Sequence, residues 1–321
     1  MPAQRHARRI VHSLHGETMG TTWSARVVAP ADMPLHHLQS GIQQCLDRVD
    51  DQMSTYKPHS ALSRFNTAPA GTWHALPQAC FTVLTHALRL ASDTGGAYDP
   101  TVGPLVNLWG FGPAARPDGT PSDSAIAEAL ERVGWWKVKL DAANEMAYQP
   151  GGSYVDLSSV AKGYAVDLAG TWLDGADIPS WLIEVGGELK GKGMKPDGSP
   201  WLIAIEHPDA SGQHGRVVSL SGRAIATSGD YRRSYRSGEQ TCSHHIDPRS
   251  GKPVRHAVAS VSILAAQAMI ADPLGTSMTV MGPEHGLAYA RERDLAVLFL
   301  LHGEHGFEER MSPAFAEAMR A

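Results

Sequence analysis

The sequence has few cysteines and no long apolar run, and these absences argue against several classes of protein. Its three cysteines, Cys45, Cys80 and Cys242, lie far apart and form no C-x-x-C pair. Neither a disulfide framework nor a cysteine-ligated zinc site is therefore expected. No apolar stretch approaches the roughly 20 residues that a helix needs to span a bilayer, so we expect no transmembrane segment.

The sequence also lacks an excess of basic residues. Lys and Arg number 28 against 33 Asp and Glu, which gives a formal net charge of −5 at pH 7. Nucleic-acid-binding domains are typically basic, so no nucleic-acid partner is expected. The N-terminal residues show neither an apolar signal core nor a cysteine for lipid attachment. We therefore expect a cytoplasmic protein as the sequence stands, or a periplasmic one if a leader was removed.

Both standard nucleotide-binding fingerprints are missing as well. Gly110 and Gly112 form a G-x-G, but no third glycine follows at the required spacing, and no Walker A motif occurs. Neither a dinucleotide-binding Rossmann motif nor a P-loop is predicted.

The apolar residues that are present predict an α+β fold. Strand patterns come in groups instead of alternating regularly with helices, which argues against a Rossmann domain. Apolar residues at helical spacing predict helices at 36–53, 81–91, 124–133, 159–173 and 266–281. Strands are predicted at 22–29, 135–140, 154–157, 181–185, 201–206, 217–220, 224–227, 259–264 and 295–301. The Gly- and Pro-rich stretch 97–113 is interpreted as a packed loop that lines something.

The segment VDLSSVAKGYAVD, residues 155–167, is a first candidate for chemistry. A strand would deliver Asp156 to the start of a helix, whose free backbone N–H groups suit a phosphate. Lys162 would add a full positive charge. Taken alone, the segment fits an ordinary helix capped by Ser158 at least as well.

A second candidate is the pair Asp272 and Thr276, which share one face of a helix because they are four residues apart. A carboxylate and a hydroxyl are hard oxygen ligands that suit Mg²⁺. The alternative is that Asp272 caps the helix and Pro273 occupies its first position. The apolar neighbours favour the metal, because a buried Asp needs a partner.

Two further groups complete the candidates. His244 and His245 precede Asp247, and a histidine of near-neutral pKa can take a proton from an attacking hydroxyl. Met19 and Tyr56 could form walls against a flat aromatic ring.

Together these segments resemble the ApbE family of FAD:protein FMN transferases. The resemblance spans about residues 16–283, and its pieces occur in the family's order. They are MGTTWS, STYKPHSALSRFN, GGAYDPTVGPLVNLWGFG, VDLSSVAKGYAVD, EVGGELKGKG, ATSGDYR, HHIDPRSGKPV and ADPLGTSMTVMG. The family moves the FMN part of FAD onto a Thr or Ser of a target flavoprotein, a redox-complex subunit or a reductase, and releases AMP.

The resemblance implies a site and a fold. The fold would have mainly antiparallel sheets flanked by helices, T-fold-like as in that family. Mg²⁺ would bind Asp272, Thr276 and the backbone carbonyl of Ser159, and His244 would act as the base. Flavin contacts would come from Met19, Tyr56, Ala97, Tyr98, Asp99, Asp156, Lys162 and Ile246. Gly275 stands where some relatives have a second carboxylate, and His245 replaces an aliphatic residue.

The expected organisation is a flavin transferase domain at 15–312, possibly of two interlocked subdomains, between tails at 1–14 and 313–321. Two other functions stay open on the sequence. One is a Mg²⁺-dependent pyrophosphatase that hydrolyses FAD to FMN and AMP, and the other is an FAD-binding protein without catalysis.

Overall fold

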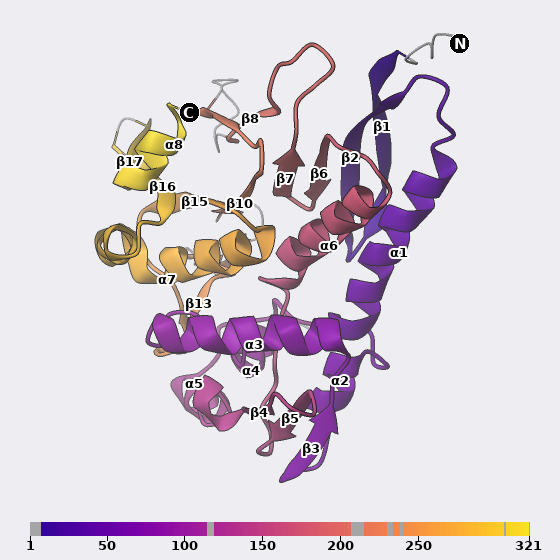
Figure 1. Ribbon diagram of the computed structural model, residues 1–321. Helices are drawn as coiled ribbons and strands as arrows, with labels where there is room; N and C mark the ends of the chain where they lie inside the picture. The colour runs from indigo at the N-terminus through magenta and orange to yellow at the C-terminus, as the bar shows by residue number, and fades with distance from the viewer. Residues whose placement is uncertain are drawn as a thin grey trace, which may run out of the picture.

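The computed structural model describes residues 8–113, 119–206, 215–229, 234–237, 240–304 and 306–320. An eight-stranded sheet runs through this part of the chain, and its neighbouring strands are all antiparallel (Figure 1). In order across the sheet, the strands are β1 (Arg9–Thr18), β2 (Thr21–Pro30), β6 (Trp181–Val185), β7 (Glu188–Lys192), β10 (Arg223–Gly229), β15 (Val258–Ala265), β16 (Ala296–Gly303) and β17 (Gly306–Met311). The predicted α+β class with mainly antiparallel sheets is confirmed.

Several helices cover one face of this sheet. In Figure 1, α6 and α7 lie in front of the strands, α1 runs along one side, and α3 crosses below them. The helices are α1 (His36–Met53), α2 (Ala61–Asn66), α3 (Gln78–Asp93), α4 (Gly103–Leu108), α5 (Asp123–Leu130), α6 (Ala161–Gly175), α7 (Ala268–Glu292) and α8 (Pro313–Ala318). A 3-10 turn, η1, spans Trp135–Lys137.

Shorter strands form separate small sheets. The three-stranded one has the order β3-β5-β4 and lies at the end of the molecule beyond α3 (Figure 1). Their bounds are β3 (Thr72–Ala75), β4 (Lys139–Asp141), β5 (Met146–Gln149), β8 (Leu202–Ala204), β9 (Val217–Ser219), β11 (Ser234–Ser237), β12 (Gln240–Ser243), β13 (Ile246–Asp247) and β14 (Lys252–Pro253).

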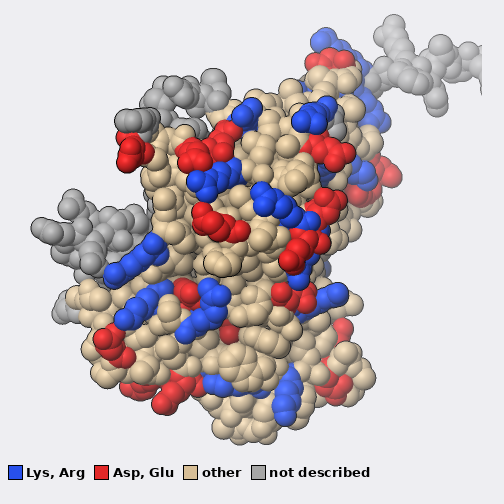
Figure 2. Space-filling model, turned by 90° about the vertical axis from the view of Figure 1, so that its left-hand side faces the viewer, with Lys and Arg blue, Asp and Glu red and all other residues tan. Residues whose placement is uncertain are grey.

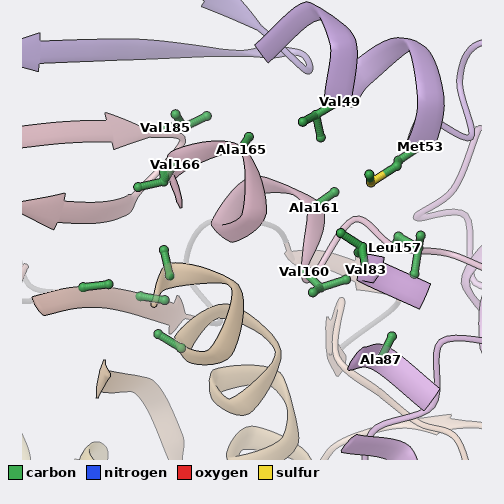
Figure 3. Close-up of a cluster of buried hydrophobic side chains, with 14 of the residues drawn as sticks. Val49, Met53, Val83, Ala87, Leu157, Val160, Ala161, Ala165, Val166 and Val185 are labelled. Carbon is green, nitrogen blue, oxygen red and sulfur yellow. The ribbon is translucent and has the colours of Figure 1, made fainter. Parts of the chain in front are cut away.

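The largest hydrophobic cluster fills the space between the main sheet and its helices. Each fully buried aliphatic side chain contributes about 1.5–3 kcal/mol to stability. Side chains from α1, α3, α6 and β6 meet there, as Figure 3 shows for Val49, Met53, Val83, Ala87, Ala161, Ala165 and Val185. A second cluster, which includes Trp201 and Phe315, is formed by strands of the sheet together with β8, β9 and α8.

Several boundaries differ from the sequence predictions. Strand β1 starts at Arg9, inside the expected tail 1–14, because it pairs along its whole length with β2; residues 1–7 lie outside the described part. Helix α8 occupies most of the expected tail 313–321, because Phe315 is fully buried in the second cluster. The strand predicted at 135–140 is wrong: η1 comes first and β4 begins only at Lys139.

One loop prediction and one strand prediction also change. The stretch 97–113 contains α4, which begins at Gly103, so it is not a plain loop. Residues 154–157 are held as an extended segment with a single bridge, between Tyr154 and Val102, and no strand forms there. No helix in the described residues combines the length and apolar character needed to cross a membrane.

Charged side chains of both signs are interspersed on the face of the molecule in Figure 2, and neither sign gathers over one element there.

Helices α6 and α7 approach each other most closely at Gly163. A Cβ atom built on Gly163 would lie 2.3 Å from the carbonyl oxygen of Ala268, at the start of α7. Backbone atoms of a second helix cannot rotate away as a flexible side chain can. Only glycine therefore permits this crossing.

We expect Gly163→Ala to lower the free energy of unfolding by about 1–3 kcal/mol, because the methyl group forces the two helices apart. Urea unfolding followed by circular dichroism measures the change. Gly175→Ala in the same helix is the matched control, since a Cβ there meets nothing within 4 Å. Equal effects of the two substitutions would contradict this account.

Candidate active site

The N-terminus of α6 is capped by a residue distant in sequence. Helix α6 begins at Ala161, and its N-cap, Val160, makes no side-chain cap hydrogen bond. The backbone N–H of Gly163 donates instead to Oδ2 of Asp272, at 3.1 Å. Capping of this helix by Ser158, the simpler reading of the sequence, is therefore wrong.

Ser159 lies just before the N-cap of α6. Gly163 is in the first turn, whose N–H groups have no acceptor within the helix, so its bond to Asp272 satisfies one of them. Among the hydrogen bonds of the described residues, none ends on the Ser159 carbonyl. The Ser159 carbonyl, two residues before the start of α6, is therefore available to a ligand.

Asp272 lies inside α7, because the helix begins at Ala268 after the N-cap Gln267. The alternative that Asp272 and Pro273 start the helix is therefore wrong. The Asp272 side chain is buried, and burial raises its pKa, while the nearby charge of Lys162 and the Gly163 hydrogen bond lower it. A buried carboxylate in such a place needs a cation or a proton.

The donor set fits a hard divalent cation. Thr276 follows Asp272 by one helical turn and is partly exposed, and the Ser159 carbonyl supplies a third oxygen. The described residues contain no group of three or more His, Cys, Asp and Glu side chains that could hold a metal. A cation here would therefore have few protein side chains as ligands, and Mg²⁺ accepts a few protein oxygens and completes its shell with water and phosphate.

Lys162 does not face this site as an unpaired cation. Its Nζ lies 2.6 Å from Oε1 of Glu188 on β7, and the Glu188 side chain is only 5% exposed. The sequence reasoning missed Glu188, although it lies in the quoted motif EVGGELKGKG. The ion pair could not be found from spacing, because 26 residues separate its partners.

Two hairpin turns of the main sheet are candidate parts of the site, and one of them borders Lys162. Met19 and Gly20 join β1 to β2 and both have positive φ, 47° and 69°. Gly186 and Gly187 join β6 to β7, and a Cβ on Gly186 would lie 3.3 Å from Cδ of Lys162. A bulky residue such as Met rarely adopts this backbone conformation, and such strain gathers at functional sites, which supports a role for Met19.

The segment that carries Asp156 is fixed from two sides. The side-chain amide of Asn66 donates to the carbonyl of Val155 and accepts from its N–H, both at 2.8 Å. The Asp156 N–H donates to the carbonyl of Pro100. Its carboxylate accepts one bond, from the N–H of Ser158, and is partly exposed.

Residues Ala97, Tyr98 and Asp99 are all buried, and two of their side chains have defined partners. The Tyr98 hydroxyl accepts a bond from Oγ of Ser159 at 3.3 Å, and burial raises its pKa. The Asp99 carboxylate accepts from the N–H and Oγ1 of Thr101 and from the N–H of Trp135. The Asp99 side chain therefore holds the fold locally, and a flavin contact at this residue would have to use its backbone.

The histidines lie next to the predicted aromatic wall. The rings of His244 and His245 are 4.0 Å apart, and His244 also meets the ring of Phe111 edge-on. Tyr56 is 62% exposed, and its hydroxyl donates to the Phe111 carbonyl at 3.5 Å. The structure thus brings both Tyr56 and His244 to Phe111, a residue that the sequence reasoning did not single out.

Ile246 anchors the loop that carries these histidines. Its side chain is buried in a third hydrophobic cluster with Leu105, Trp109 and Ile126. The indole of Trp109 donates to the carbonyl of Gly251 in the same loop. Like Asp99, Ile246 supports the site through packing, so a flavin contact would come from its backbone.

Comparison with known proteins identifies a family for this arrangement. The model of the ApbE family matches residues 19–299. A Vibrio cholerae protein named FAD:protein FMN transferase is 40% identical over 94% of this chain and 91% of its own. A Haemophilus influenzae protein of the same name is 38% identical over 95% and 90%. The crystal structure of Pseudomonas stutzeri flavinyl transferase ApbE in its apo form superposes with a TM-score of 0.90 at 37% identity, covering 98% of both chains.

Burial of His245 predicts a dependence of stability on pH. Its pKa lies well below the usual 6.5, because burial and the charges of His244 and His256 oppose protonation. Below pH 6.5 the His245 side chain binds a proton in the unfolded chain but not in the folded chain, so the free energy of unfolding falls as the pH falls. At pH 5.5 the loss should be about 1 kcal/mol relative to pH 7.5.

Urea unfolding at the two pH values measures this loss. His245→Leu should remove that part of the pH dependence, whereas the same change at exposed His36 should leave it as in the wild type. A His245→Leu variant with the wild-type pH dependence would show that His245 is not the group responsible.

Proposed function

Because the chain belongs to the ApbE family, we propose that it transfers the FMN part of FAD to a Thr or Ser hydroxyl of a target flavoprotein. AMP is released, and the reaction depends on Mg²⁺. The predicted enzyme class, FAD:protein FMN transferase, is confirmed by the relatives of that name. The acceptor hydroxyl, the AMP product and the metal are the proposed part.

The observation that carries the proposal is the capping of α6 by Asp272. It places a buried carboxylate at the start of α6, and the Ser159 carbonyl two residues before that start accepts no hydrogen bond from the described residues. A divalent cation on these oxygens would offset the charge of a pyrophosphate and of the departing phosphate. Asp272, Thr276 and the Ser159 carbonyl would hold it.

Of the other residues, several would bind the phosphates or the flavin, and one would move a proton. The glycine turn at 186–187 lets a phosphate approach the backbone closely, and Lys162 borders the same place. The exposed ring of Tyr56 suits stacking on the flavin, and Met19 supplies a polarisable thioether. Figure 1 shows the strands and helices that bring these segments together from distant parts of the chain.

The proposed reaction exchanges one phosphorus–oxygen bond for another. The acceptor oxygen forms a bond with the phosphorus on the riboflavin side, and the bond from that phosphorus to the bridging oxygen breaks. AMP leaves with that oxygen and its electron pair. His244 takes the proton of the acceptor hydroxyl, so the phosphodiester forms without that proton.

We expect a target flavoprotein subunit incubated with this protein, FAD and Mg²⁺ to gain the mass of FMN less one water, with AMP in equal amount. Mass spectrometry of the subunit and chromatography of the nucleotides measure both. FMN and AMP released without any adduct would identify a pyrophosphatase instead.

Asp272→Ala should abolish transfer at every Mg²⁺ concentration, and full activity in that variant would refute the metal site.

The two histidines should differ in their effect on the rate. His244→Gln should lower kcat by about 10²–10⁴-fold, the usual contribution of a positioned general base. His245→Leu should stay within about tenfold of wild type, because its buried ring acts only through its neighbour. Single-turnover rates of flavin transfer give the comparison, and the reverse order of effects would assign the base to His245.

A further inference from the structure

The charge of the site is opposite to what a pyrophosphate needs. Asp99, Asp156, Glu188 and Asp272 contribute four carboxylates among the described side chains assigned to the site, whereas Lys162 contributes one ammonium. The Lys162 ammonium is moreover neutralised by Glu188 at 2.6 Å. A ligand with a doubly charged pyrophosphate would therefore meet an excess of negative charge.

The Lys162–Glu188 pair is one of two matched ion pairs between α6 and β7. The second joins Asp167 of α6 to Lys190 of β7, also at 2.6 Å. Five residues of helix advance by about 7.5 Å, and two residues of strand by about 7 Å, so both pairs form in register. Asp167 additionally accepts a bond from the N–H of Met269 and so caps α7.

The second pair and the buried apolar residues of α6 also link the helix to the sheet. Burying an ion pair contributes little stability compared with apolar residues of similar size. Glu188, with a side chain 5% exposed, is the more deeply buried of the two acids. Its position next to Lys162, away from the capping network, indicates a role in the site.

We propose that Glu188 is a positioning residue that holds and neutralises the Lys162 ammonium, so that the site binds FAD only together with a divalent cation. The inference rests on the proposed function. With Glu188 charged, the site repels the pyrophosphate until a cation reverses its sign. Without that charge, Lys162 pairs with the phosphate directly.

Fluorescence titration of FAD in Mg²⁺ and in a chelator tests the proposal without measuring catalysis. We expect wild type to bind FAD at least about a hundredfold more weakly in the chelator. Glu188→Gln, which keeps the shape and removes the charge, should bind FAD in the chelator about tenfold or more tightly than wild type. Glu188→Asp should restore the wild-type dependence, and riboflavin, which has no phosphate, should bind all variants alike.

Lys190→Met is the matched control, because it removes the other ion pair of α6 and β7 and lies outside the site. It should keep the wild-type dependence on Mg²⁺. The proposal is overturned if Glu188→Gln keeps that dependence, or if Lys190→Met loses it to the same extent. Melting temperatures of the variants show that each is folded. A wild-type protein that binds no FAD even with Mg²⁺ overturns the proposed function and this inference together.

Discussion

The hydrogen bond from the Gly163 N–H to the Asp272 carboxylate is the contact on which the site depends. It forms only because Gly163 has no side chain to hold α7 away from α6. The same contact holds the buried carboxylate at the start of α6. One close helix crossing therefore provides both the capping and the buried charge. In the opposite direction, the carboxylate of Asp167 in α6 accepts a hydrogen bond from the N–H of Met269 at the start of α7. The two helix starts therefore fix each other's position.

Sequence periodicity was sufficient to predict the helices and strands whose buried residues recur at regular spacing. Helix 36–53 was predicted with both ends correct, because its apolar residues repeat at helical spacing and face the core. The strand at 181–185 was predicted as well, because it is a short apolar run that ends at a pair of glycines. In such segments local pattern and tertiary packing agree.

The predictions failed where a distant side chain replaced a local one. Ser158 is a good helix cap by type, but α6 starts three residues later, and Asp272 provides the capping oxygen. Residues 154–157 look like a strand, yet the amide of Asn66 takes the hydrogen bonds that a neighbouring strand would make. The Lys162–Glu188 pair joins residues on different elements. No window of sequence contains both members of these contacts.

For two residues, the role implied by the family resemblance differs from the role of the side chain in the structure. Asp99 and Ile246 are implied as flavin contacts, but the carboxylate of Asp99 is saturated by Thr101 and Trp135. The side chain of Ile246 is buried in a cluster with α4 and α5. These side chains cannot leave their partners without exposing buried N–H groups or apolar surface. They would serve a ligand by fixing the backbone next to them, and a motif can in this way include residues whose side chains do not reach the ligand.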